Sequence, residues 1–141
     1  MKKRLAVFMI CAMAAALLNC PGCRKAAAHY LLTDVTWMLT AIHYSPMNIV
    51  NINKPFSIVF KKNGEAELTV DCNRCSYIYE ITAGNEIIFS AGKCTEAYCG
   101  VDSQDKTFHT ALGSTTTFLV TGNQLEIYFD KGSGILLFTA E

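Results

Sequence analysis

The chain has 141 residues, with twelve basic and twelve acidic side chains, and 51% of its residues are hydrophobic. This length suits one domain with a real core. All twelve acidic residues lie after His29, together with only seven basic ones, so the net charge from His29 onward is −5. Nucleic-acid affinity depends on neutralising phosphates, so an acidic domain without a basic stripe excludes that class of partner.

The N-terminus predicts export. Basic residues at positions 2–4 precede an apolar run from Leu5 to Leu18 that contains no charged side chain. This is the pattern of a secretory signal, and a run of about 14 residues is shorter than the roughly 20 that a transmembrane helix needs. We expect a signal peptide over residues 1–19, with cleavage as late as residue 28, and a tether over residues 20–34.

The end of the signal contains three candidate cleavage sites. Residues 17–20 (Leu-Leu-Asn-Cys) resemble a bacterial lipobox, in which Cys20 would carry the lipid, and Cys23 after Gly22 is the alternative. The alanines at 26–28 form an ordinary cleavage site. We expect an outer-membrane or cell-surface lipoprotein that contacts the membrane only through a lipid on Cys20. Cleavage at the alanines would give a periplasmic or secreted protein.

From residue 35 onward, β-branched and aromatic residues alternate with turn residues, which predicts short antiparallel strands. The expected strands are Val35–Ile42, Ser57–Phe60, Glu65–Val70, two strands around residue 84, Thr117–Thr121, Leu125–Phe129 and Ile135–Thr139. Residues 44–55, with two prolines and three asparagines, are expected to form a long loop. Asn63-Gly64 is expected to form a type I′ turn.

The hairpin around residue 84 can be given a register. A three-residue loop at residues 83–85 places six apolar or aromatic side chains on one face. The expected pairs are Ile81 with Ile87, Tyr79 with Phe89, and Tyr77 with Ala91. A two-residue turn would mix the faces, because a one-residue slip moves every side chain to the other side. We therefore expect the three-residue loop.

One helix is expected between residues 102 and 113. Asp102 or Ser103 can cap it, and Asp105 suits the positive end of the helix dipole. Gly113 can end it. Its apolar stripe comprises Phe108, Ala111 and Leu112. The expected fold over residues 35–141 is mostly β (α+β), with six to eight antiparallel strands in a closed or nearly closed barrel-like sheet covered by this helix.

Four of the seven cysteines lie in the domain, as Cys72-x2-Cys75 and Cys94-x4-Cys99. In a cytosolic chain such pairs would suggest zinc, but behind a signal peptide the oxidising compartment favours structural disulfides. A redox role is less favoured, because no βαβ unit follows the Cys-x-x-Cys motif and no helix N-terminus is expected there. We expect no metal and no cofactor.

Several short motifs, in order along the chain, resemble those of the META domain, also called HslJ-like, of small bacterial envelope proteins. The matching residues are Trp37-x-Leu39, Asp71-Cys72-Asn73 with Tyr79, Thr95–Cys99, Phe108 with Leu112, Leu125-x-Ile127 and Leu136-x-Phe138. Asp71 and Tyr77 depart from the family, which usually has Gly at both positions, where Gly permits unusual backbone angles or close approach. The resemblance implies the fold and an envelope location, without an assigned reaction.

Four cysteines permit three pairings. The expected register places Cys75 opposite Lys93, so a bridge from Cys75 to Cys94 needs only a local kink. Cys72 and Cys99 lie farther out, at positions that match two motifs of the resembled family. We predict the nested disulfides Cys72–Cys99 and Cys75–Cys94. The pairing within each motif would close loops too short for much entropic gain.

We expect an envelope-associated structural or interaction module without catalytic activity, which supports surface integrity or stress tolerance by contacting an envelope component. No nucleophile–base pair or phosphate loop stands out, and the three histidines are scattered. One alternative is a small-ligand carrier whose candidate pocket residues are Trp37, Tyr77, Tyr79 and Phe89. Tyr98 and Tyr128 could also line such a pocket, but all these aromatic residues are more simply core or barrel wall. The other alternative is a thiol oxidoreductase that uses Cys72 and Cys75.

Overall fold

The structure is a computed structural model that describes residues 31–45, 47–82 and 84–141. The predicted signal peptide, its cleavage sites and the lipidation candidates Cys20 and Cys23 lie outside these residues. Among the described residues, no helix has the length and apolar character needed to cross a membrane.

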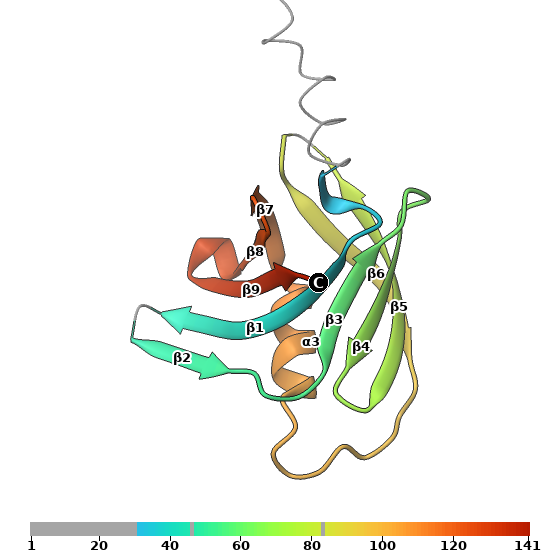
Figure 1. Ribbon diagram of the computed structural model, residues 1–141, viewed down its shortest axis with the longest axis vertical. Coiled ribbons are helices and arrows are strands. Elements are labelled where there is room, and N and C mark those ends of the chain that lie inside the picture. The colour runs from blue at the N-terminus through green and yellow to red at the C-terminus, as the bar shows by residue number, and fades with distance from the viewer. Residues whose placement is uncertain (1–30, 46, 83) are drawn as a thin grey trace, which may run out of the picture.

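Within the described residues, the domain contains nine antiparallel strands and one short helix (Figure 1). In chain order they are β1 (Thr36–Ser45), β2 (Asn48–Asn51), β3 (Phe56–Phe60), β4 (Glu65–Val70), β5 (Asn73–Ile81), β6 (Ile87–Cys94), α3 (Asp105–Gly113), β7 (Thr115–Thr121), β8 (Gln124–Phe129) and β9 (Gly134–Ala140), with a 3-10 turn at Asp130–Gly132 before β9. Eight strands follow the order β6-β5-β4-β3-β1-β9-β8-β7, and β2 pairs with β1 beside this path.

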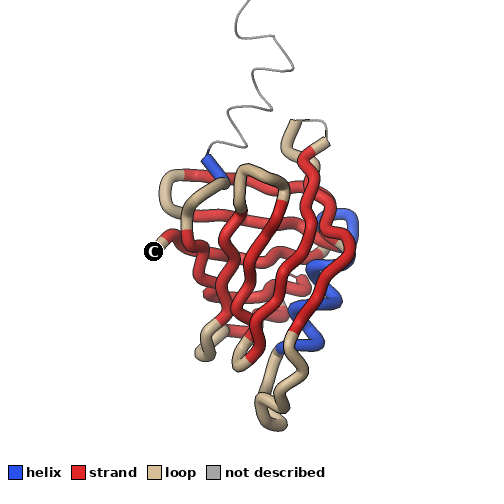
Figure 2. Tube along the Cα trace, turned by 90° about the vertical axis from the view of Figure 1, so that its right-hand side faces the viewer, coloured by secondary structure: helices blue, strands red, loops and turns tan. Residues whose placement is uncertain are grey.

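The two outer strands of the sheet, β6 and β7, bring the barrel close to closure. The backbone N–H of Phe118 donates to the carbonyl of Asn85 at 2.9 Å, and Glu86 forms a bridge with Thr117. The helix α3 connects β6 to β7 and lies beside the strands at this opening (Figure 2). The prediction of a mostly β, nearly closed barrel with one covering helix is confirmed.

Alternating side chains of the strands fill the barrel interior, as a sheet with one buried face requires. The largest fully buried side chains are Trp37, Phe56, Phe60, Phe108, Phe118, Phe129 and Phe138. The expected helix stripe is correct, because Phe108, Ala111 and Leu112 are all buried. Phe108 meets Phe56 edge to face, with ring centroids 5.5 Å apart, which fixes the helix over the core.

The packed domain begins within the segment that we expected to be tether. Leu32 is completely buried, and its carbonyl accepts a hydrogen bond from Trp37 Nε1 at 3.0 Å. Thr33 forms a bridge with Phe60. Leu32 therefore belongs to the core rather than to a linker ahead of Val35.

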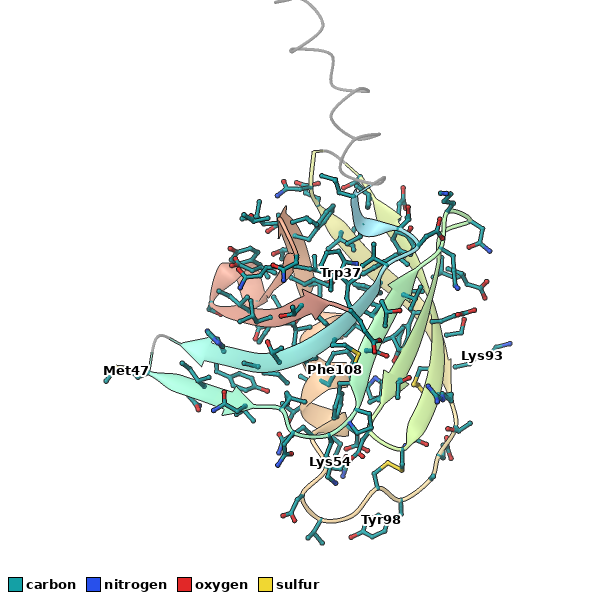
Figure 3. The ribbon with its side chains drawn as sticks, viewed as in Figure 1. Trp37, Met47, Lys54, Lys93, Tyr98 and Phe108 are labelled. Atoms are coloured by element: carbon teal, nitrogen blue, oxygen red, sulfur yellow. A yellow bond between two sulfur atoms is a disulfide. The ribbon has the colours of Figure 1, made fainter. Side chains whose placement is uncertain are left out.

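The expectation of one long loop at residues 44–55 is wrong. β1 continues to Ser45, and β2 pairs with it, for example through His43 and Ile49. Three of the four residues of β2 are exposed, so its sequence lacks the alternation that marks a half-buried strand. The β1–β2 hairpin projects from the barrel with Met47 at its end, 95% exposed (Figure 3).

The turn at Asn63-Gly64 is not type I′. Gly64 has φ +86°, but Asn63 is not among the residues of positive φ. The N–H of Gly64 donates to the carbonyl of Lys61, and the N–H of Lys61 donates to the carbonyl of Glu65. The hairpin therefore has a three-residue loop, in which Gly occupies the left-handed position after a type I turn.

The β5–β6 register agrees with the expected one near the turn and departs from it at Tyr77. Ile81 pairs with Ile87 and Tyr79 with Phe89, but a β-bulge places residues 91 and 92 together opposite Tyr77. The extra residue in β6 then brings Cys94 directly opposite Cys75. This bulge is the local kink that a Cys75–Cys94 bridge requires.

The N-terminal end of the helix differs from the sequence prediction, whereas its end at Gly113 agrees with it. Gln104, rather than Asp102 or Ser103, precedes the first helical residue, and its side chain forms no capping hydrogen bond. Ser103 Oγ instead accepts a hydrogen bond from the N–H of Asp105 at 3.3 Å. Gly113 is the last helical residue and Ser114 follows as the C-cap, whose N–H donates to the carbonyl of Ala111.

Candidate functional site

The candidate site lies where the chain leaves β6 and enters α3. We call residues 95–104 the stapled loop, because a disulfide ties it to the barrel. Between this loop and the start of α3 lies an open cleft of about 590 Å³. Its walls include Asn73, Cys94, Tyr98, Asp105, Lys106 and His109.

Two disulfides hold this region. Cys72 is bonded to Cys99 and Cys75 to Cys94, with Cα atoms 5.5 and 4.1 Å apart, in the nested arrangement expected from the hairpin register. The first bridge anchors the middle of the stapled loop, and the second joins β5 to the end of β6. Cys72 and Cys75 are not bonded to each other, so this Cys-x-x-Cys motif does not form a local redox disulfide.

Asn73, the first residue of β5, holds the stapled loop through its side-chain amide. Its Oδ1 accepts hydrogen bonds from Thr95 Oγ1 and the N–H of Ala97, both at 2.8 Å. Its Nδ2 donates to the carbonyl of Ala97 at 3.0 Å and lies 3.2 Å from Cys99 Sγ. The side chain is 6% exposed, so these partners satisfy an amide that would otherwise be buried at a cost. The motif Asp71-Cys72-Asn73 indicated this position, but the sequence did not reveal what Asn73 holds.

Asp71 and Lys54 anchor the other side of the loop. Lys54 Nζ lies 3.1 Å from Asp71 Oδ2 and also donates to the carbonyl of Cys99 at 3.1 Å. Burial raises the pKa of Asp71, but hydrogen bonds from Ser103 and Lys54 and the charge of Lys54 outweigh it, so the pKa lies below 3.8. Asp71 has φ +55°, the left-handed conformation that Gly adopts freely and Asp tolerates.

The stapled loop presents apolar side chains to solvent. Tyr98 is 81% exposed and Val101 is 88% exposed, and Figure 3 shows Tyr98 directed away from the loop. The interpretation of Tyr98 as core or barrel wall is therefore wrong. Its immediate neighbours in the chain, Ala97 and Cys99, are the residues held by Asn73 and Cys72, so a restrained backbone displays an exposed ring.

His109 faces the Cys75–Cys94 disulfide from α3. Its Nδ1 lies 2.9 Å from the hydroxyl of Tyr77, and its Nε2 lies 3.9 Å from Cys94 Sγ. Burial lowers the pKa of His109 below 6.5, partly opposed by the charge of Asp105. The sequence could not indicate this cluster, because Tyr77 is 32 residues from His109 and Cys94 is 15 residues away.

The four candidate pocket residues do not line this cleft. Trp37 and Tyr79 are buried in the core, where the hydroxyl of Tyr79 donates to the carbonyl of Lys61 at 2.8 Å. Tyr77 and Phe89 are half-buried and meet edge to face, with centroids 6.5 Å apart. These residues pack as barrel wall and core, as the simpler interpretation expects.

The fold and the site define a class: a small antiparallel β-barrel domain with a covering helix and a disulfide-tied loop. Residues 30–141 match the META domain, and the chain belongs to that family. The resemblance stated from the motifs is thus confirmed. No curated protein matches the chain.

Solved structures share this fold. An NMR structure of a protein from Burkholderia xenovorans is 21% identical, covers 82% of this chain and 87% of its own, and has a TM-score of 0.67. A second protein solved by NMR is 19% identical over 79% and 92% of the two chains, with a TM-score of 0.59. A crystal structure of a DUF4847-family protein from Bacteroides vulgatus is 12% identical over 79% and 95%, with a TM-score of 0.60. At these identities the similarity concerns the fold alone.

Proposed function

We propose that this protein is an exported, envelope-associated META domain that binds another envelope protein through the stapled loop and carries no catalytic activity of its own. The observation that supports the proposal is the exposure of Tyr98 and Val101 on a backbone held at Thr95, Ala97 and Cys99. Tyr is enriched among the residues that dominate interface energies. A loop held before binding loses little conformational entropy when a partner covers it.

The charge around the loop indicates the chemistry of the partner. Glu96 and Asp102 are exposed on the loop beside Tyr98 and Val101, and the domain from His29 onward is acidic. A complementary surface would combine an apolar pocket for the tyrosine ring with basic side chains around it. We therefore propose a partner with a basic rim rather than an acidic one.

Site-specific photocrosslinking in intact cells tests this interface. A photoreactive residue in place of Tyr98 should form one discrete adduct, whereas the same residue in place of Met47 should not. Met47 is a suitable control because it is also a large, highly exposed side chain but lies at the end of the β1–β2 hairpin. The double substitution of Tyr98 and Val101 by Ala should abolish copurification of the crosslinked protein. Equal adducts at positions 98 and 47 would contradict the proposal.

Export with a lipid anchor is the second part of the proposal. It rests on the basic residues at 2–4, the apolar run that follows and Cys20 at its end. Intact-mass spectrometry of protein isolated from cells should give a chain that begins at Cys20 with added acyl mass. A mass that includes Met1 to Leu18 would refute export. An unmodified chain that begins near His29 would refute lipidation and indicate a periplasmic or secreted protein instead.

The cleft beside α3 supports a second candidate, small-ligand binding. Its volume of about 590 Å³ falls within the range of known ligand pockets. The barrel interior is occupied by side chains, so a ligand would bind at this cleft rather than inside the barrel. In NMR spectra of the mature protein, a ligand in the cleft should shift the signals of Lys106 and His109 together with those of Tyr98 and Val101, which also line it. A partner that covers only the outer side of the loop should shift Tyr98 and Val101 and leave Lys106 and His109 unchanged.

A further inference from the structure

Three potential metal-binding side chains meet at the end of β6, where the stapled loop begins. The sulfur atoms of Cys75 and Cys94 and a ring nitrogen of His109 all lie within 4.8 Å of one another. They come from three different elements, β5, β6 and α3, so the fold rather than a local motif assembles them. With the disulfide intact, both sulfurs lack the thiolate form that metals bind.

Tyr77 orients the histidine for this role. The hydroxyl of Tyr77 holds Nδ1 of His109 at 2.9 Å, which leaves Nε2 directed at Cys94 Sγ. Metal-binding histidines almost always use the second ring nitrogen in such a hydrogen bond. The ring of Tyr77 lies close over Gly92, where an added Cβ would be 2.2 Å from a ring carbon, so the bulge in β6 keeps space for this ring.

The cleft supplies an entry path. Cys94 and His109 both line it, and Asp105 adds a carboxylate to its wall. A cation and a water molecule can therefore reach the cluster from solvent without opening the barrel. The other disulfide has different surroundings: Cys99 Sγ lies 3.2 Å from the N–H of Cys72 and 3.2 Å from Asn73 Nδ2.

We propose that Cys75, Cys94 and His109 form a redox-gated site that binds one Zn²⁺ ion when their disulfide is reduced. A dithiol reductant transfers two electrons and two protons to the disulfide, which becomes two thiols while the reductant becomes a disulfide. Zn²⁺ then displaces the two thiol protons into solvent and binds both thiolates and Nε2 of His109. Water from the cleft takes the fourth position, as in sites with three protein ligands.

The required movement is small. Zinc sites place sulfur about 2.3 Å and nitrogen about 2.0–2.1 Å from the metal, so the two sulfurs must move apart and His109 must approach slightly. The ion would link α3 to β5 and β6 when the covalent bond between those strands is absent. Under oxidising conditions, Cys75 and Cys94 would thus stabilise the base of the stapled loop as a disulfide. Under reducing conditions, the same two cysteines would stabilise it together with His109 as a metal centre.

Cobalt substitution tests the site on the mature chain. The disulfide is first reduced with a phosphine, which has no thiol that could compete for the metal. One equivalent of Co²⁺ should then produce thiolate-to-cobalt charge-transfer bands and the d–d bands of a tetrahedral site. Added Zn²⁺ should abolish these bands. The variant Cys72→Ser/Cys99→Ser should retain these bands, and the matched variant Cys75→Ser/Cys94→Ser should lose them. His109→Ala should weaken cobalt binding at least about tenfold and alter the spectrum, and Tyr77→Phe should weaken it by about tenfold while retaining the spectrum.

Several outcomes would overturn the proposal. They are equal binding by the two double-serine variants, an unchanged affinity in His109→Ala, and cobalt bands in the oxidised protein. Circular dichroism covers the case in which the reduced chain unfolds: one equivalent of Zn²⁺ should then restore the β spectrum of the Cys72→Ser/Cys99→Ser variant. A failure to restore it would also count against the site.

Discussion

The contribution of Asn73 illustrates how one side chain can organise a loop of ten residues. Its amide meets Thr95, Ala97 and Cys99, and its side chain is almost fully buried. We expect Asn73→Ala to lower the free energy of unfolding by about 1–3 kcal/mol, because the loop groups it satisfies would be left unpaired. Urea denaturation measures this change. Asn53→Ala, at an exposed position between β2 and β3, is the matched control and should change stability by less than about 0.5 kcal/mol; equal effects would contradict the role of Asn73.

Asp71 should make the stability depend on pH in the acid range. Its folded pKa lies below the ordinary 3.8, so the unfolded chain binds the proton first as the pH falls. The stabilisation by this carboxylate is therefore complete above that ordinary value and is lost as the pH falls below it towards the folded pKa. Asp71→Asn keeps a residue that tolerates positive φ but removes the charge.

Urea denaturation across the acid range measures the difference between the two proteins. The wild type should be more stable than Asp71→Asn at neutral pH, and the gap should shrink below pH 4 or so. The other carboxylates titrate in both proteins, so the difference isolates Asp71. A gap that stays constant down to pH about 2 would refute the assigned ion pair with Lys54.

At the residue scale, sequence reasoning found positions more readily than contacts. The Asp71-Cys72-Asn73 motif indicated the position of Asn73. The expected register together with a local kink predicted the Cys75–Cys94 bridge, and the motif positions of the resembled family predicted Cys72–Cys99. The roles of Lys54 and His109 depend on neighbours that lie 45 residues away for Lys54 and 32 for His109. No periodic or spacing signal records such contacts, because they exist only once the barrel has formed.

The bulge in β6 shows what one inserted residue does to a strand. Without it Cys75 would face Lys93, and with it Cys75 faces Cys94. Gly92 lies in the bulge, across the strand pair from Tyr77. An added Cβ at Gly92 would lie 2.2–2.6 Å from three ring carbons of Tyr77, so the glycine is required by close approach rather than by its φ.

Gly92→Ala should therefore destabilise the protein by about 1–3 kcal/mol, because the half-buried ring of Tyr77 must move and lose its contact with His109. Thermal denaturation measures the change, and the ring signals of Tyr77 and His109 in NMR spectra should shift with it. Gly113→Ala is the control. Gly113 is helical, has no positive φ and has open space around it, so the change should be neutral or stabilising by up to about 1 kcal/mol. A stable Gly92→Ala variant with unshifted ring signals would contradict this packing.

Elements with a buried face were predictable, and exposed elements were not. The strands β3, β4 and β9 alternate between buried and less buried residues, which is the signal that sequence periodicity reports. β2 lacks that alternation and forms because β1 extends far enough to pair with it. The type I′ turn predicted at Asn63-Gly64 is wrong because Asn-Gly suits more than one turn, and the turn type depends on the register of the flanking strands.

At the scale of the whole molecule, β1 joins two halves of the barrel. It pairs with β3 of the meander β3–β6 on one side and with β9 of the meander β7–β9 on the other. The segment before β1 also contacts β3, since the N–H of Asp34 donates to the carbonyl of Phe60 at 2.9 Å. The alternating pattern predicted the barrel class, but the start of the domain could not be read from composition, because Leu31 and Leu32 are identical in type and opposite in burial.

That pair of leucines provides a direct test of where the folded unit begins. Leu32 is fully buried and Leu31 is 55% exposed, so Leu32→Ala should lower the free energy of unfolding by about 2–4 kcal/mol and Leu31→Ala by less than about 0.5 kcal/mol. A mature chain shortened to begin at Val35 should lose at least as much as Leu32→Ala, because it also loses the acceptor of Trp37 Nε1 and the bridge between Thr33 and Phe60. Urea denaturation followed by the fluorescence of Trp37, the single tryptophan of the chain, measures all three proteins. If the shortened chain were as stable as the full mature one, the segment before Val35 would be a tether after all, and the barrel would need only the residues that follow it.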